Sequence, residues 1–285
     1  MFIFCILVWG SSYLVVKFQN NFAPSEFSLM LRLIIALLFF IPLYVIFNRS
    51  ADLNKSYYID IGIFGLCNFM TGYLLLYFAT KSLSSGLVIV IFSFKSILTP
   101  ILISVSKRKR PEILLILGSV VAIIGIGFLI DGALLNNTTS YVGLVFAIFG
   151  TLVTSIGDLY SSKNNDHDIQ PIFANLVGLL WVMPILLIIN IDNFGYIIQI
   201  KHFYYSLSIL YLGIVASGIA WLFYLSLVKN IGASYASYMV TLFPVVGCIL
   251  SIKFENMPFS INSLIGLFLE VCGLLLAFIK WRDMA

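Results

Sequence analysis

Apolar residues fill this chain in long runs, and polar residues are confined to the short connectors between them. A helix of about 20 residues rises roughly 30 Å, which matches the hydrocarbon core of a bilayer. The runs lack the polar face that a soluble amphipathic helix presents to water. The pattern therefore predicts an all-α membrane protein with ten transmembrane helices. The predicted spans are residues 1–16, 27–47, 61–80, 86–106, 113–130, 141–162, 171–191, 203–228, 231–252 and 261–279.

Composition excludes a soluble domain and offers no metal site. Hydrophobic residues make up 61% of the 285 residues and charged residues only 10%, a surface that water could not solvate. The first apolar run starts at Met1 without a basic segment or a cleavage motif, so we expect a retained helix. We expect no cofactor. The four cysteines lie in apolar runs without metal-ligand spacing and are interpreted as small hydrophobic residues: Cys5, Cys67, Cys248 and Cys272.

Lysine and arginine are distributed unevenly among the connectors. The connectors after even-numbered runs and the C-terminal segment hold ten of these residues, and the connectors after odd-numbered runs hold four. Positive charge marks the cytoplasmic side, so we expect a multi-pass protein of the cell inner (plasma) membrane with both termini in the cytoplasm. The cluster Lys107–Arg110 is interpreted as part of this signal, with acidic-lipid binding as the alternative.

The two halves of the chain resemble each other at an offset of about 147 residues. The segment Trp9–Tyr13 aligns with Ile156–Tyr160, and Tyr77 aligns with Tyr224. Gly118 and Gly125 recur as Gly266 and Gly273. Five helices in each half is an odd number, so two halves that fold alike must have opposite orientations in the membrane. We therefore predict two inverted five-helix repeats, residues 1–131 and 141–280.

Several short motifs resemble the EamA-type branch of the drug/metabolite transporter superfamily over nearly the whole chain. They are Trp9-Gly10-Ser11-Ser12, Ala23-Pro24 followed by Arg32-Leu33, Tyr77, Ala79, Leu83 and Ser84, and the better match Tyr224, Leu227, Ala233, Ser234 and Leu242-Phe243-Pro244-Val245. The resemblance implies metabolite transport and a cavity walled by helices one, three, four, six, eight and nine. Lys95-Ser96 and Glu270 depart from the family pattern.

The leading functional hypothesis is a secondary transporter. It would move a small metabolite, amino-acid-like or another small organic compound, across the plasma membrane by alternating access. The chain has no phosphate-binding loop, so transport would not be driven by nucleotide hydrolysis. The alternatives are an intramembrane enzyme, disfavoured because His167 and His202 lie in connectors, and a channel or non-transporting membrane partner. The expected partners are the substrate and the lipid bilayer, without nucleic acid; a homodimer is left open.

Four ionisable residues lie inside the predicted spans, where a charge is costly unless it has a partner or faces a cavity. Lys95 and Glu270 lie at similar depth, so Lys95 either pairs with Glu270 or binds a substrate carboxylate or phosphate. The remaining alternatives are that Lys95 extends toward the headgroups or that each of the two residues has another partner. Arg32 lies near the end of its span, where it could extend to the headgroups, pack against backbone carbonyls or guard the outer entrance. Asp158 is expected near the cytoplasmic interface, solvated or acting as a gate. Arg32, Asp158 and Glu270 are the candidate gating or coupling residues.

Aromatic residues on the helices that line the family cavity complete the predicted site. The candidate substrate-binding residues are Trp9, Tyr13, Tyr77, Lys95, Trp221, Tyr224 and Tyr238. Asn68 and Asn175 are interpreted instead as polar residues that hold neighbouring helices together. Of the charged residues, Lys95 is expected to matter most for transport, because it cannot easily reach either headgroup layer.

Overall fold

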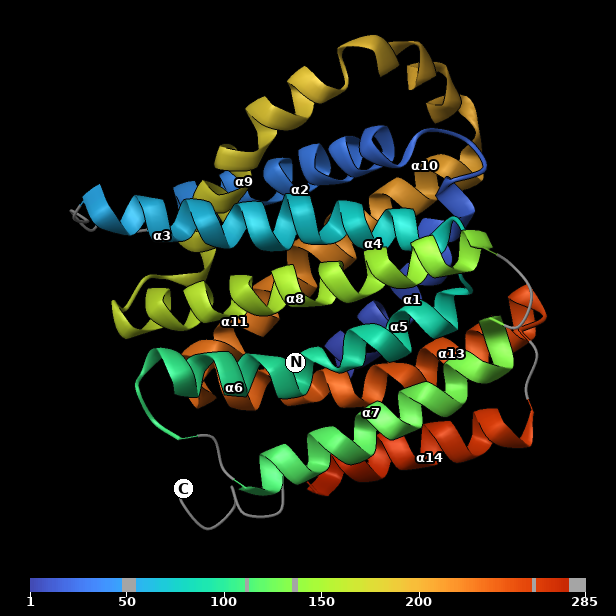
Figure 1. The fold of residues 1–285 in the computed structure, drawn as a ribbon. Helices are drawn as coiled ribbons and strands as arrows, with labels where there is room; N and C mark the ends of the chain where they lie inside the picture. Colours follow the sequence, from blue (N-terminus) through green and yellow to red (C-terminus); the bar gives the residue numbers. More distant parts are fainter. Residues whose placement is uncertain (48–54, 111–112, 135–137, 258–259, 277–285) are drawn as a thin grey trace.

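A computed structural model describes residues 1–47, 55–110, 113–134, 138–257 and 260–276 (Figure 1). Within these residues all regular secondary structure is helical, without strands, as the apolar pattern predicted. In the first half the helices are α1 (Phe2–Gln19), α2 (Ser25–Phe47), α3 (Lys55–Gly65), the π-helical segment η1 (Leu66–Thr71), α4 (Gly72–Thr80), α5 (Ser85–Ser93), α6 (Lys95–Ser106) and α7 (Ile113–Leu134).

The second half continues the same all-helical arrangement. Its helices are α8 (Thr138–Asp166), α9 (Pro171–Ile189), the 3-10 segment η2 (Ile191–Lys201), α10 (Phe203–Leu210), the π-helical segment η3 (Tyr211–Ile219), α11 (Ala220–Ile231), α12 (Ala233–Ser237), the 3-10 segment η4 (Tyr238–Leu242), α13 (Phe243–Glu255) and α14 (Ile261–Leu276).

Seven helices in the described part of the chain are long and apolar enough to cross a membrane. They cover 2–19, 25–47, 57–80, 85–106, 141–166, 171–189 and 203–231. Two further apolar helices, 116–128 and 261–273, are shorter, and the run predicted at 231–252 is divided among α12, η4 and α13. The chain is a multi-pass membrane protein, and the count of ten spans stays a prediction.

Irregular helix segments occur at matching places in the two halves. The π segments η1 and η3 interrupt the third and eighth apolar runs, and the breaks at Phe94 and at η4 interrupt the fourth and ninth. Both pairs are about 147 residues apart, the offset found in the sequence. Pro100 and Pro244 lie shortly after the two breaks, and a proline clashes with the carbonyl four residues before it. The sequence offset is thus repeated in the local geometry.

Helix ends alternate between the two ends of the bundle, so successive spans run in opposite directions (Figure 1). The C-terminal ends of α1, α4, α7, η2 and α13 lie at one end, which we call the Lys17 end. Those of α2, α6, α8 and α11 lie at the opposite end, called the Lys107 end.

The pair α7 and α14 lies side by side at one edge of the bundle (Figure 1). Their backbones approach closely through glycines: a Cβ atom added at Gly125 would lie 2.5 Å from the backbone nitrogen of Glu270, and one added at Gly273 would lie 2.5 Å from that of Ala122. Glycines allow such contacts between membrane helices, where packing rather than water drives association.

Candidate functional site

A cavity lies at the centre of the bundle, between the two halves. Its walls come from α1, α2, η1, α4, α5, α6, α8, α11 and η4. The cavity volume is about 40 Å³, which is room for roughly three water molecules. The lining residues are Trp9, Ser12, Tyr13, Val16, Arg32, Asn68, Tyr73, Tyr77, Phe92, Lys95, Thr154, Trp221, Tyr224 and Val240.

Lys95 forms a buried ion pair with Asp158, not with Glu270. The Lys95 ammonium nitrogen lies 3.1 Å from Asp158 Oδ1, and both side chains are almost fully buried. Tyr224 donates a hydrogen bond of 2.8 Å to Asp158 Oδ2, and Thr99 donates one of 3.3 Å to the same oxygen. The pair joins the break in the fourth run to α8, so it connects the two halves at the centre of the bundle.

The expectation that Asp158 lies in solvent near the interface is therefore wrong. Helix α8 continues to Asp166, about two turns beyond Asp158, which places the carboxylate well inside the bundle. Asp158 is 0% exposed.

Glu270 has a different environment from the one that an ion pair with Lys95 would require. Its side chain is fully buried and accepts a hydrogen bond from Ser93 on α5 through Oε1. Its Oε2 has no hydrogen-bond partner, and no cation lies within ion-pair distance among the described residues. Similar depth did not bring the two residues together, because Glu270 lies on α14, which packs against α7 at the edge of the bundle.

Arg32 lines the cavity. The alternative in which its side chain extends to the headgroups is therefore wrong. Arg32 is 3% exposed. Its Nε donates a hydrogen bond of 2.7 Å to Ser217 on η3, and its Nη1 lies 3.4 Å from the hydroxyl of Tyr77. The guanidinium carbon stands 4.2 Å from the centre of the Tyr73 ring. These contacts link α2 to both halves of the chain.

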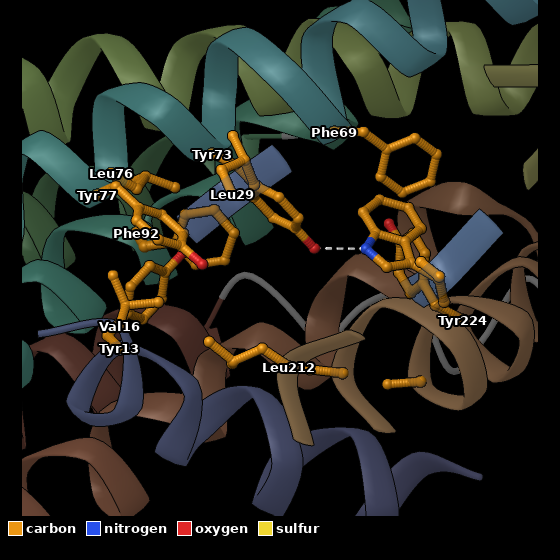
Figure 2. Packing of buried hydrophobic residues seen from close by; sticks show 14 of the residues in the cluster. Tyr13, Val16, Leu29, Phe69, Tyr73, Leu76, Tyr77, Phe92, Leu212 and Tyr224 are labelled. Atoms are coloured by element: carbon orange, nitrogen blue, oxygen red, sulfur yellow. Dashed lines mark hydrogen bonds between the residues drawn. The ribbon is translucent and has the colours of Figure 1, made fainter. Parts of the chain in front are cut away.

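Aromatic rings form much of the cavity wall. The rings of Trp9, Trp221 and Tyr224 contact one another edge to face, with centroids 5.4 to 5.5 Å apart. The indole nitrogen of Trp221 donates a hydrogen bond of 2.5 Å to the Tyr73 hydroxyl, and Figure 2 marks this bond with a dashed line from Tyr73. Tyr13 lies at the other side against Phe92, with ring centroids 5.7 Å apart.

The structure thus brings together most of the site residues that were predicted from the sequence. Trp9, Tyr13, Arg32, Tyr77, Lys95, Trp221 and Tyr224 all line the cavity, and Asp158 contacts it through Lys95. Glu270 does not line it. Tyr238 lies in η4, and its side chain is outside the described part of the structure.

Asn68 is a cavity residue that sequence reasoning assigned to helix packing. It is 0% exposed and lies in the π segment η1, and among the described residues neither its amide nitrogen nor its amide oxygen has a hydrogen-bond partner. It packs directly on Gly157, where an added Cβ would lie 2.2 Å from the Asn68 amide nitrogen. A π turn is a frequent mark of a functional position, but its register cannot be read from a uniformly apolar sequence.

Charged contacts join the two halves at the Lys17 end. Lys17 on α1 pairs with Glu255 on α13 at 3.0 Å and also donates to the carbonyl of Leu83 at 3.0 Å. The backbone N–H and the hydroxyl of Ser85 donate to Glu255 at 2.9 and 2.5 Å. Burial alone would raise the pKa of Glu255, but the hydrogen bonds from Ser251 and Ser85 and the charge of Lys17 outweigh it and hold that pKa below its usual range.

A second set of contacts lies at the Lys107 end. Lys107, the residue after α6, pairs with Asp166 on α8 at 3.0 Å and connects the halves there. Lys229 pairs with Asp168 at 2.8 Å within the second half. These pairs are more exposed to solvent than the Lys17–Glu255 pair, and exposed ion pairs contribute little stability.

A comparison with family models decides the classification. The model described as the EamA-like transporter family matches residues 1–130 and matches again over 141–279. The chain belongs to the EamA-like transporter family. The two matches also divide this EamA-like chain into two repeats, in agreement with the sequence offset.

Structural comparison finds a similar fold in a solved protein. One solved crystal structure, described only as that of a protein, is similar to this EamA-like chain with a TM-score of 0.66 and 15% sequence identity. The similarity covers 96% of this chain and 98% of that one. At such low identity it supports the fold alone. No curated protein sequence matches the chain. Membership of the EamA-like family makes the chain a membrane protein of a small-molecule transporter family.

Proposed function

We propose that this EamA-like protein is a secondary transporter that moves a small organic metabolite across the plasma membrane by alternating access. The observation that carries the proposal is the central cavity, which is buried, lies between two repeats and is lined by aromatic and charged side chains from both. Transporters built from repeats commonly place their substrate site at this position. The substrate would contact Arg32, Lys95, Trp9, Tyr13, Tyr77, Trp221 and Tyr224.

The contacts at the two ends support alternating access. The Lys17–Glu255 pair and the Lys107–Asp166 pair each join one repeat to the other, and each lies at a different end. Opening one end requires only its own pair to separate while the other holds. The broken runs at Phe94 and η4 offer places where the helices can bend during such a change. The cavity of about 40 Å³ in this closed arrangement must enlarge before a metabolite can enter.

Counterflow in liposomes tests the function. Bound ligand raises thermal stability, so a metabolite library screened against the purified protein selects the compounds to test. Vesicles that contain the protein and are loaded with an unlabelled hit are expected to accumulate the labelled compound transiently and saturably, while protein-free vesicles do not. Uptake that never saturates would indicate a channel, and recovery of a chemically altered compound would indicate an enzyme.

We also propose that both termini are cytoplasmic and that the Lys17 end faces outward, because basic residues are concentrated in the other connectors. Asn136, an otherwise suitable labelling position, lies outside the described residues. Asp192 in η2 and Gln170 before α9 are exposed and lie at opposite ends. A membrane-impermeant thiol reagent is expected to label Asp192→Cys in intact cells and to label Gln170→Cys only after permeabilisation, with the parent protein as background. The reverse pattern would invert the topology.

A further inference from the structure

Arg32 carries a buried positive charge that no acidic residue offsets in the described part of the chain. Its contacts there are the hydroxyls of Ser217 and Tyr77 and the ring of Tyr73, all of them neutral. None of the ion pairs within 4.0 Å among the described residues includes Arg32. A buried charge is costly unless it is paired, and hydrogen bonds to neutral groups recover only part of that cost.

The other cation of the cavity wall is already paired. Lys95 is neutralised by Asp158, whose remaining oxygen accepts hydrogen bonds from Tyr224 and Thr99. The site, including Asp158, therefore has a surplus of one positive charge, and this surplus is at Arg32. A ligand that carries one negative charge would balance it, whereas a zwitterion or a cation would leave it unchanged or increase it.

A second, independent observation also points to a polar ligand in this cavity. Asn68 is fully buried and lines the cavity, yet both polar atoms of its amide lack a hydrogen-bond partner within the part of the chain that the structure describes. A buried amide without partners costs on the order of 1–3 kcal/mol in proteins. A ligand oxygen could accept a hydrogen bond from its N–H group, and Asn68 lies in a different helix from Arg32.

We propose that the cavity binds a small organic monocarboxylate, with its carboxylate at Arg32 and its apolar body against the rings of Trp9, Trp221 and Tyr224. This inference rests on the transporter function proposed above and names its substrate class. The planar guanidinium matches the two oxygens of a carboxylate. A phosphate dianion fits less well, because only one positive charge is free and the walls are mainly aromatic.

Ligand binding to the purified, full-length protein tests the proposal without requiring transport. The probes are monocarboxylates from acetate to 3-phenylpropionate, with phenylalanine as the zwitterion, 2-phenylethylamine as the cation, and inorganic phosphate. We expect an apolar monocarboxylate to raise the midpoint of thermal unfolding in a saturable manner and the other three probes to have little effect. Preference for the zwitterion, the amine or phosphate, or no binding by any monocarboxylate, would overturn the proposal.

The Arg32→Gln variant separates ligand binding from a structural role. Because it removes an unpaired buried charge, the unliganded variant should unfold at the same temperature as the parent protein or above it. Its affinity for the monocarboxylate should fall about 10- to 100-fold, the range expected for loss of charge-assisted hydrogen bonds. Lys229→Gln removes a cation at the Lys107 end and should leave the affinity unchanged. Unchanged affinity in Arg32→Gln would overturn the proposal.

The Arg32→Lys variant tests the proposal if Arg32→Gln does not fold, and counterflow distinguishes failure of the monocarboxylate site from failure of the transporter function. If Arg32→Gln does not fold, Arg32→Lys keeps the charge and loses the planar fork, so weaker carboxylate binding supports the proposal and unchanged binding overturns it. Counterflow separates the two proposals. Saturable counterflow of an amine or zwitterion alone would leave the transporter function standing and remove the monocarboxylate. Carboxylate binding without counterflow of any bound compound would support the monocarboxylate site and remove the transporter function.

Discussion

Replacing Lys95 by methionine is expected to destabilise the protein by about 3–5 kcal/mol, because it leaves the Asp158 carboxylate buried without its counter-charge. Asp158→Asn should be similarly harmful, since it leaves the ammonium unpaired. The double variant Lys95→Met with Asp158→Asn should recover most of the loss. The amide oxygen that replaces the carboxylate in the double variant can still accept hydrogen bonds from Tyr224 and Thr99, which now donate to Asp158. Folded yield and thermal unfolding of the two singles and the double measure the coupling.

An exposed ion pair provides the matched control. Lys107→Met removes the cation of the pair with Asp166, whose side chains are 46% and 48% exposed. Its cost should be at most about 1 kcal/mol. Double-variant stability equal to the sum of the two single losses would contradict the Lys95–Asp158 pair. If stability recovers when Lys95→Met is combined with Glu270→Gln, and not when it is combined with Asp158→Asn, then Glu270 is the partner of Lys95.

Gly125→Leu is expected to force α7 and α14 apart and to cost on the order of 3 kcal/mol, at the upper end of the usual overpacking range. The first added carbon would lie 2.5 Å from the Glu270 backbone nitrogen and 2.6 Å from the Gly266 carbonyl oxygen. Backbone atoms in a helix cannot move aside as a flexible side chain can. The contact between Glu270 and Ser93 should loosen with the displaced helix.

Gly127 on the same helix is the control for this prediction. No described atom lies within 4 Å of a Cβ added there, so Gly127→Leu should not destabilise the protein, and it should gain up to about 1 kcal/mol of stability because glycine is a poor helix former. The measurement is the thermal unfolding midpoint of both variants in the same detergent. Equal midpoints for the two variants would show that the close approach of α7 and α14 is not required for stability.

The Lys95–Asp158 pair and Arg32 are suited to different roles in the cavity. The pair connects the break in the fourth run to α8 with a satisfied ionic contact, which suits a structural or positioning role in the change between states. Arg32 is an unpaired cation among neutral groups, which suits a ligand. Depth along the span favoured Lys95 as the binding residue; the geometry shifts that emphasis to Arg32.

The membrane class, the apolar runs, the offset between the halves and the aromatic candidates could all be predicted from the residues alone. Apolar runs of this length have few alternatives, because a helix is the structure that satisfies its own backbone hydrogen bonds in lipid. Trp9, Tyr13, Trp221 and Tyr224 could be nominated because the family resemblance assigned their helices to the cavity wall. All four line it.

Which charged groups meet could not be predicted in this way, because it depends on how the helices pack. Position along a span fixes the depth of a side chain, so Lys95 and Glu270 looked like partners. Depth does not give the direction in which a helix face points or which helix lies beside it. Because α8 continues well beyond Asp158, the Asp158 carboxylate lies inside the bundle, where it pairs with Lys95. Because α14 packs on α7, Glu270 accepts a hydrogen bond from Ser93 instead. In a uniformly apolar helix no polar face marks the inward side, so rotation and neighbours are set by packing between helices, which a single sequence does not display.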